Sequence, residues 1–355
     1  MIILGIETSC DETAAALIAG KGDKIKVISN IVSSQIKIHR RYGGVIPELA
    51  ARNHIKNILP VINEALQTSP LFPLLIKERV PKAGEADAIA VTTGPGLIPT
   101  LLIGIETAKA LAYAWNKPII GVNHLAGHIY SNFIGNHKKI KFPALILIVS
   151  GGHTELVLMR GHFQFKLLGQ TRDDAAGEAF DKAAKILNLG YPGGPAVAQR
   201  AAEITNYKLQ ITKITLPRPM INESSCDFSF SGLKTALLYK IQRDKNWQSK
   251  IPAYCAEFQQ AIIDVLISKT IKAAKKYKVK SVMLAGGVAA NIELRRQLKQ
   301  ALAQSLPQTA YFVPNLKYTT DNAAMIAAAG YFYLKNIKTK KLPKIKVNCN
   351  QRLTK

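Results

Sequence analysis

One order of strands, turns and helices occurs twice along these 355 residues, and it constrains the fold more than any other feature. In each half, an apolar run typical of a buried strand ends in a polar or glycine-rich turn, and two more strands follow. Later in each half, a second buried strand ends in a glycine turn that precedes a helix. The four buried strands are expected at Ile2–Ile6, Asp87–Thr92, Ala144–Val149 and Ser281–Leu284. This repeat predicts a duplicated α/β domain.

The repeat also predicts where the domains divide. The first domain is expected to comprise residues 1–123 plus 322–355, and the second residues 124–321. Residues 68–84 contain three prolines and three basic residues, which favours a surface insertion. The tail from Lys335 is basic and lacks acids, which favours a solvated arm. The main helices are expected at Pro47–Gln67, Leu97–Trp115, Gly177–Leu189, Pro195–Ile204, Leu233–Gln242, Pro252–Lys276 and Ala289–Leu302.

Two such domains facing each other would leave a cleft, with the glycine turns at its rim, because ligands bind at strand ends in sheets of this kind. This arrangement resembles the actin, sugar kinase and heat-shock ATPase superfamily, which is built from two ribonuclease-H-like domains. The resemblance implies that two phosphate-binding turns clamp a nucleotide.

Charge and composition indicate the class of partner. The 48 lysines and arginines exceed the 23 acids, and the formal net charge is +25. Such a surplus favours an anionic partner, nucleic acid ahead of a membrane surface, although lysines that merely decorate the surface are the alternative. Four scattered cysteines without a Cys-x-x-Cys pair indicate a reduced, cytoplasmic protein. No signal peptide is expected, and the apolar run Gly96–Gly121 carries Glu106 and Lys109, as a buried helix would.

Two glycine turns are candidates for nucleotide binding. At Ser150, Gly151 and Gly152, backbone N–H groups could converge on phosphate oxygens, although a plain hairpin turn also uses glycines. The second turn, at Gly286 and Gly287, precedes a helix whose positive end could hold an anion or an adenine–ribose unit.

Two histidines four residues apart, His124 and His128, would share one face of a helix and could bind one metal ion. Surface or capping histidines are the alternative. A metalloprotease is disfavoured because Leu125 stands where the general-base glutamate would be. The best third ligand is Asp321, although Asp321 or Thr320 could instead cap the following helix. Two imidazoles and one carboxylate suit Fe²⁺, with Zn²⁺ as the alternative.

Several carboxylates are further candidates. Asp11 and Glu12 follow the first strand, where they could act in catalysis or simply solvate the turn. A cluster of acids in this basic chain favours a role facing a ligand or metal, although some members would be caps: Asp173, Asp174, Glu178 and Asp181.

These motifs together resemble one family, the bacterial-type tRNA N6-adenosine threonylcarbamoyltransferases, formerly described as O-sialoglycoprotein endopeptidases. They follow the family's order over most of the chain. The matching segments are Gly5–Thr13, Gly43–His54, Gly94–Leu97, Val122–His128, Val149–Thr154, Asp174–Lys182, Tyr191–Pro195, Phe228–Thr235, Gly286–Asn291 and Thr320–Met325.

The resemblance implies a reaction. The threonylcarbamoyl group of threonylcarbamoyl-AMP is transferred to N6 of adenosine 37 in tRNAs that read codons beginning with A, and AMP leaves. Asp11 would accept the amine's proton or place the base. The resemblance implies that His124, His128 and Asp321 hold the metal. It implies that the adenylate is held by Leu147, Ile148, Val149, Ser150, Gly151, Asp181, Gly194 and Asn291, so that most of the site lies in the second domain.

The resemblance also implies partners: tRNA, an inactive paralogue of the same fold (TsaB-like) and a small P-loop ATPase (TsaE-like). No membrane contact is expected. The basic segment 37–41 and the C-terminal tail are candidate phosphate contacts. Two rival functions stay open: an ATPase or kinase of the same superfamily, and a non-catalytic RNA-binding scaffold.

Overall fold

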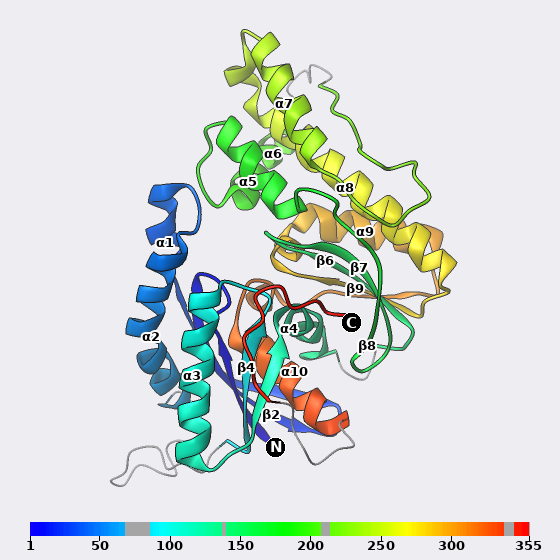
Figure 1. Ribbon diagram of the computed structural model, residues 1–355. Helices are drawn as coiled ribbons and strands as arrows, with labels where there is room; N and C mark the ends of the chain where they lie inside the picture. The colour runs from blue at the N-terminus through cyan, green and yellow to red at the C-terminus, as the bar shows by residue number, and fades with distance from the viewer. Residues whose placement is uncertain (68–85, 137–139, 207–213, 337–343, 355) are drawn as a thin grey trace. The chain divides into compact units, whose positions relative to one another are not determined.

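The computed structural model describes residues 1–67, 86–136, 140–206, 214–336 and 344–354 (Figure 1). These residues form two compact units. The first unit comprises Met1–Ile140, Gly161–Gln164 and Pro314–Lys355, and the second comprises Lys141–Arg160 and Phe165–Val313. The insertion predicted at 68–84 lies outside the described residues.

The first unit is built on a five-stranded sheet in the order β3-β2-β1-β4-β5. The central strand β1 pairs antiparallel with β2 and parallel with β4, and β5 extends the parallel part. The strands are β1 (Ile2–Glu7), β2 (Glu12–Lys21), β3 (Lys24–Ser34), β4 (Ala88–Gly94) and β5 (Ile119–Asn123).

Helices cover both faces of this sheet. On one face, α2 (Pro47–Gln67) and α3 (Ile98–Trp115) pack over a core that includes Leu4, Ile6 and Val91. On the other face, α10 (Ala323–Asn336) crosses β1 and packs against the short helix α4 (His124–Tyr130). The run Gly96–Gly121 is therefore mostly α3, as predicted. None of the described helices is both long and apolar enough to cross a membrane.

The second unit repeats the plan. Its sheet has the order β10-β9-β6-β7-β8, in which β6 pairs antiparallel with β7 and parallel with β9. Numbered within its own unit, each sheet has the order 3-2-1-4-5. This shared order confirms the duplicated, ribonuclease-H-like fold class. The strands are β6 (Ala144–Val149), β7 (Thr154–Gly161), β8 (Gln164–Gln170), β9 (Ser281–Ala285) and β10 (Ala310–Phe312).

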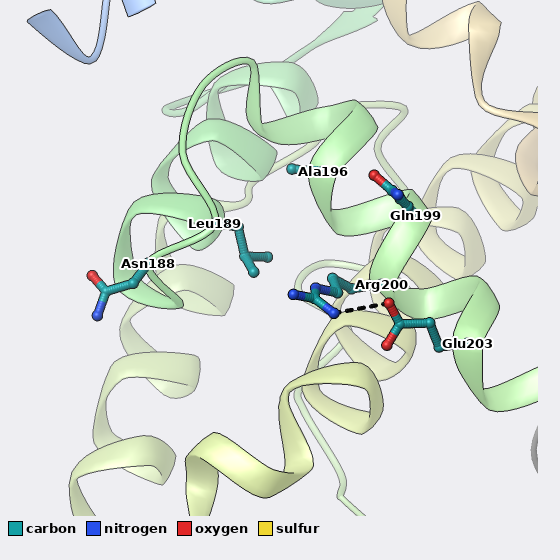
Figure 2. A pocket seen from close by; sticks show the side chains of 6 residues that line it. All are labelled: Asn188, Leu189, Ala196, Gln199, Arg200 and Glu203. Atoms are coloured by element: carbon teal, nitrogen blue, oxygen red, sulfur yellow. Dashed lines mark hydrogen bonds and ion pairs between the residues drawn. The ribbon is translucent and has the colours of Figure 1, made fainter. Parts of the chain in front are cut away.

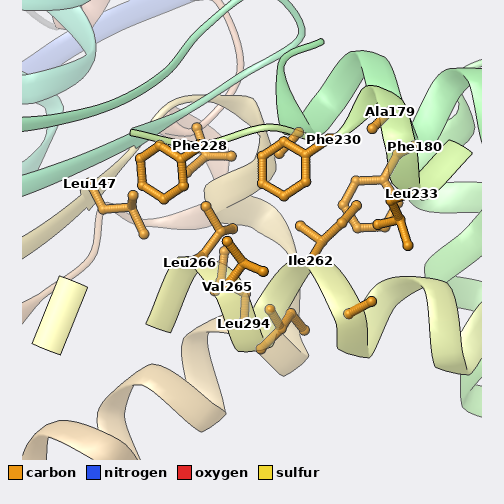
Figure 3. Packing of buried hydrophobic residues seen from close by; sticks show 14 of the residues in the cluster. Leu147, Ala179, Phe180, Phe228, Phe230, Leu233, Ile262, Val265, Leu266 and Leu294 are labelled. Atoms are coloured by element: carbon orange, nitrogen blue, oxygen red, sulfur yellow. The ribbon is translucent and has the colours of Figure 1, made fainter. Parts of the chain in front are cut away.

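The core of the second unit lies between its sheet and a layer of helices. Phe228 and Phe230 stack with ring centroids 6.3 Å apart, and they pack beside Ile262 and Leu266 of the long central helix (Figure 3). Full burial of such side chains stabilises a fold by about 1.5–3 kcal/mol each. The helices are α5 (Ala176–Ile186), α6 (Gly193–Asn206), α7 (Ser231–Arg243), α8 (Ile251–Lys276) and α9 (Ile292–Ser305).

The units divide at other points in the chain than the sequence predicts. Residues 124–140 and 314–321 belong to the first unit, whereas the predicted second domain was 124–321. The reason is packing, because α4 lies against α10 of the first unit. His124, His128 and Asp321 therefore all belong to the first unit, and the predicted metal site is not part of the second.

The solvated C-terminal arm was a wrong prediction for residues 344–354. The N–H of Asn348 donates to Thr93 O over 2.9 Å, and the N–H of Gly96 donates to Cys349 O over 3.2 Å. Ile345 and Val347 alternate with exposed residues and pack against the core beneath α2 and α3. Those two apolar side chains, spaced two apart, anchor an otherwise basic segment.

Candidate functional site

The structure brings His124, His128 and Asp321 together. Both histidines lie on α4, and Asp321 lies just before α10. Nε2 of His128 is 3.2 Å from Oδ1 of Asp321, and Nε2 of His124 is 3.5 Å from the same oxygen. One ligand atom from each residue lies within 4.8 Å of the other two. This is the spacing of side chains that can share one metal ion.

His128 supplies a test of whether a metal fits. Its side chain is 1% exposed, and neither ring nitrogen forms a hydrogen bond to any of the described residues, although Asp321 lies within ion-pair distance. A buried polar atom without a partner costs about 1–3 kcal/mol. A metal ion bound by Nε2 would remove that cost at this nitrogen, so the residues fit a metal.

Asp321 is not needed to cap the following helix. Oδ1 of Asn322 accepts the hydrogen bond from the N–H of Met325 over 3.0 Å, so Asn322 caps α10. The alternative that Asp321 or Thr320 serves as the cap therefore loses its support. The carboxylate of Asp321 faces the two imidazoles instead.

A second carboxylate, that of Glu7 at the end of β1, contacts the ring nitrogen of His124 that does not face Asp321. Nδ1 of His124 lies 3.1 Å from Oε2 of Glu7. Glu7 also accepts hydrogen bonds of 2.6 Å from the hydroxyl of Thr92 and from the N–H of Ser9. Metal-binding histidines usually donate their other ring N–H to such a group, which fixes the ring's tautomer and orientation.

Charge reinforces this arrangement. Burial would lower the pKa of His124, but Asp321 and Glu7 raise it well above its ordinary value. Burial would raise the pKa of Glu7, but the charge of His124 and the hydrogen bonds to it and to Thr92 hold that pKa below the ordinary value. The pKa of Asp321 is likewise lowered by the two histidines, despite its burial. The group is thus strongly attractive to a cation.

Sequence reasoning assigned no role to Glu7. The available signal was an acid at the end of an otherwise continuous apolar strand. An acid in that position has a side chain that packing can bury, and here Glu7 is 0% exposed.

Asp11 and Glu12 differ in environment. Glu12 is buried at the start of β2, where Oε1 accepts a hydrogen bond of 2.8 Å from Ser34 and Oε2 has no partner in the part of the chain that the structure describes. Burial raises the pKa of Glu12 to about 8. Asp11 is half-buried, and burial together with the charge of Asp321 raises its pKa. Asp11 is the more accessible of the two.

A buried histidine, His54, forms hydrogen bonds to the turn that carries Asp11. Nε2 of His54, on α2, lies 3.0 Å from the carbonyl of Cys10, and its Nδ1 lies 2.7 Å from the hydroxyl of Thr13. Burial lowers the pKa of His54, which keeps the ring neutral. A neutral ring can donate at one nitrogen and accept at the other, as these two contacts require.

In the second unit, the turn after β6 is exposed at Gly151 and Gly152. The N–H of Ser150 donates to His153 O over 2.8 Å, which closes the turn. A Cβ at Gly151 or Gly152 would meet nothing within 4 Å, and neither glycine has a positive φ. Chain geometry therefore does not require these glycines, and they leave their backbone N–H groups approachable. This favours the anion-binding role over a plain hairpin turn.

The other predicted adenylate residues surround the ends of β6 and β9. Asp181 on α5 accepts a hydrogen bond of 2.7 Å from the N–H of Gly193, beside Gly194. Asn291 caps α9 by accepting from Leu294 N–H, and its amide donates to Gln259 over 2.8 Å. The 3-10 turn η5 (Gly287–Ala290), which precedes Asn291, packs against α5, β6 and β9.

Three predicted adenylate residues contribute no exposed side chain. Leu147, Ile148 and Val149 are fully buried in β6, which is paired on both edges. Their visible role is to hold the strand that ends at Ser150. Gly286 is different again: with φ of 90° it lies in the left-handed region, and a Cβ there would be 2.4 Å from Val149 O. Only glycine lets β6 and the turn after β9 approach so closely.

Three of the four clustered acids of the second unit have partners within the protein. Asp173 accepts hydrogen bonds from the hydroxyls of Ser229 and Ser231 at the start of α7. Asp174 and Glu178 both pair with Lys182. These partners favour a structural role for Asp173, Asp174 and Glu178, whereas Asp181 stays a predicted adenylate residue. Among the described residues, His124, His128 and Asp321 form the one group with metal-binding spacing.

A pocket lies at the end of α5 beside α6 (Figure 2). Arg200 and Glu203 form an ion pair of 2.9 Å in its wall. None of the predicted site residues lines it. Its lining is Asn188, Leu189, Ala196, Gln199, Arg200 and Glu203.

Comparison with known proteins places the chain among characterised sequences. Residues 26–328 match the family profile described as tRNA N6-adenosine threonylcarbamoyltransferase. A relative of that name from Syntrophomonas wolfei is 50% identical over 339 residues, which is 94% of this chain and 93% of the relative. The relative of that name from Bacillus subtilis is 50% identical over 332 residues, which is 93% of this chain and 90% of the relative.

Solved structures add information on the fold alone. HypF from T. kodakarensis superposes with a TM-score of 0.59 at 15% identity, over 94% of this chain and 47% of that one. A full-length HypF in a phosphate- and nucleotide-bound form gives a TM-score of 0.56 at 14% identity, over 94% of this chain and 56% of that one. The shared feature is the duplicated architecture.

Proposed function

This chain belongs to the tRNA N6-adenosine threonylcarbamoyltransferase family, and from that premise we propose its reaction. The enzyme transfers the threonylcarbamoyl group from threonylcarbamoyl-AMP to N6 of adenosine 37 in tRNAs that read codons beginning with A, and releases AMP. The observation that carries the proposal is the convergence of His124, His128 and Asp321 in a chain half identical to enzymes of that name. A tRNA substrate accords with the net charge of +25, and we propose a cytoplasmic location.

Acyl transfer to the N6 amine involves three changes of bonding, each of which the protein must assist. The N6 nitrogen forms a bond to the carbamoyl carbon, the bond from that carbon to the AMP phosphate oxygen breaks, and one proton leaves the amine. An Fe²⁺ ion, or Zn²⁺ as the alternative, would polarise the acyl oxygens as a Lewis acid when bound by His124, His128 and Asp321. Glu7 keeps the ring of His124 oriented for this task.

We assign proton removal to Asp11. It is more accessible than Glu12, and its raised pKa brings it closer to the range in which a carboxylate works as a general base. The contacts of His54 with Cys10 and Thr13 hold this turn in place. Glu12 is buried with a pKa of about 8, so it serves as a protonated neighbour rather than as the base.

Nucleotide recognition is assigned to the second unit. The exposed turn after β6 offers the backbone N–H groups of Gly151 and Gly152 to the phosphate. Asp181 and Asn291 shape the neighbouring turns through their hydrogen bonds to Gly193 and Leu294. A Cβ at Gly194 would meet no neighbour closer than 4.0 Å, so this position leaves room for a ligand.

Exposed apolar side chains support the paralogue of the same fold as a protein partner. Helix α2 exposes Ile55 and Leu59, and the adjacent helix α3 exposes Ile98 and Leu102. Each pair is spaced four residues apart and so lies on one face of its helix. Exposed apolar faces of this kind mark protein interfaces. The small P-loop ATPase is proposed from the family resemblance.

Mass spectrometry of tRNA tests the function. The protein, its two partner proteins, threonylcarbamoyl-AMP and unmodified tRNA are incubated, and nucleosides are then quantified. Wild type should form threonylcarbamoyladenosine, His124→Ala should form about 10²-fold less or none, and Lys272→Ala on the surface of α8 should match wild type. Full product from His124→Ala would contradict the proposal, as would ATP hydrolysis without any product on tRNA.

A further inference from the structure

Residues 344–354, here called the C-terminal strap, run along the ends of β4 and β5. Backbone hydrogen bonds join Asn348 to Thr93 and Cys349 to Gly96, on either side of the turn after β4. The hydroxyl of Thr93 also donates to Oε1 of Gln351 over 3.1 Å. The strap is therefore bound by both main-chain and side-chain contacts.

The first unit is shaped to receive this strap. A Cβ at Gly94 would lie 1.8 Å from the carbonyl oxygen of Asn348, so any larger residue would displace the strap. A Cβ at Gly121 of β5 would lie 3.0 Å from Cδ1 of Ile345. Two glycines at the contact surface thus permit a close approach that a solvated tail would not need.

One side chain connects the strap with the metal-binding helix. Nδ2 of Asn123 donates to the carbonyl oxygens of Gln351, over 3.2 Å, and Arg352, over 3.4 Å. Oδ1 of the same amide accepts from the N–H of Ala126 over 3.1 Å and so caps α4. The next residue along the chain is His124. A single amide therefore bonds to the strap at one end and to the first turn of α4 at the other.

We propose that the C-terminal strap is part of the metal centre's supporting structure, and that Asn123 is a positioning residue that transmits its order to His124. Helix α4 has only seven residues, so its own hydrogen bonds hold its first turn weakly. Ligand geometry must be held within about 0.5 Å for tight binding. The strap fixes the amide of Asn123, the amide fixes the first turn, and the first turn carries His124. This inference rests on the proposed metal site.

Thermodynamic linkage makes the proposal testable in both directions. If strap order favours metal binding, then metal binding must favour strap order by the same factor. If the strap served stability alone, disrupting it would lower the melting temperature. Metal affinity would then be unchanged at a temperature where the protein is folded.

The first experiment measures Co²⁺ affinity of the full-length protein from the metal's d–d absorption. Asn123→Ser keeps a capping oxygen, because serine is as good an N-cap as asparagine, but is too short to reach the strap. We expect affinity to fall about tenfold, as for loss of other supporting partners. Gln351→Ala, which removes the bond from Thr93, should weaken binding in the same direction. Arg352→Ala keeps the carbonyl that Asn123 uses and should bind Co²⁺ like wild type.

The second experiment measures hydrogen exchange at the strap. The amides of Asn348 and Gly96 are bonded across the contact, so they should exchange about tenfold more slowly when Co²⁺ is added to wild type. In Asn123→Ser this effect of Co²⁺ should be lost. Wild-type affinity in both Asn123→Ser and Gln351→Ala, with no effect of Co²⁺ on exchange, would overturn the inference while leaving the metal site intact. A wild-type protein that binds no Co²⁺ would overturn the metal site as well.

Discussion

Nδ1 of His124 lies 3.1 Å from Oε2 of Glu7, a carboxylate that is fully buried at the end of the central strand of the first sheet. This pairing leaves Nε2 of His124 facing Asp321. His124 thus lies between Glu7, which orients its ring, and Asp321, which is proposed to bind the same metal ion. Glu7 therefore contacts the ring nitrogen of His124 that does not face Asp321.

Replacing Glu7 by glutamine should weaken metal binding about 10- to 100-fold, the usual cost of losing a partner that orients a ligand. The amide is similar in size but lacks the negative charge that favours a cation. Chelator competition at fixed pH measures the dissociation constant. The matched control is Glu106→Gln on α3, which removes an exposed acid paired with Lys109. Equal affinity in Glu7→Gln and wild type would show that Glu7 does not support the ligand.

Replacing Asp11 by asparagine should slow transfer about 10²- to 10⁴-fold, the range that general acid–base catalysis contributes. Binding of tRNA and of the donor should change little, because Asp11 is proposed to act on the proton alone. Single-turnover rates with saturating substrates separate the chemical step from binding. A full rate for Asp11→Asn would rule out its role as the base.

Glu12 should make the stability of the first unit depend on pH. Its pKa is about 8 in the folded chain, against an ordinary value of 4.5. Because the folded state binds the proton more tightly, the associated stability is complete below about pH 4.5 and is lost as the pH rises through 8. The free energy of unfolding of Glu12→Gln relative to wild type should therefore be higher at pH 9 than at pH 5, by about 2 kcal/mol or more.

Urea denaturation of the Glu12→Gln protein at the two pH values measures this difference. The exposed acid Glu48, which pairs with Arg52 on α2, provides the control as Glu48→Gln. If the difference in free energy of unfolding between Glu12→Gln and wild type were constant from pH 5 to 9, Glu12 would titrate as an ordinary carboxyl.

The basic segment at α1 (Ile36–His39) and the following turn η1 (Arg40–Tyr42) should contact tRNA phosphates. Lys37, Arg40 and Arg41 are there, and both arginines are exposed. Each phosphate contact adds about 0.7–0.9 to the slope of log K against log salt. The Arg40→Ala/Arg41→Ala double variant should therefore bind tRNA more weakly and lower the slope by about 1.5. Filter binding at several KCl concentrations measures it, and an unchanged slope would remove this segment from the tRNA contact.

Local pattern determined much of the fold. Apolar runs and glycine turns predicted the central strands β1 and β4 of the first sheet, because a buried strand needs consecutive apolar residues whatever its neighbours are. The four-residue spacing of His124 and His128 placed both on one helical face, since helix geometry depends on the local backbone alone. The duplication could likewise be recognised, because the same order of elements appears in both halves.

Tertiary structure decided what those elements do. Asp321 could have been a cap or a ligand, and only the positions of Asn322 and the two histidines distinguish these roles. The tail looked solvated because its charge dominates its composition, yet Ile345 and Val347 pack against the core and Gly94 makes room for its backbone. The burial of Glu7 arises in the same way. Each of these depends on residues far apart in the chain, and contacts of that kind leave no periodic signal in the sequence.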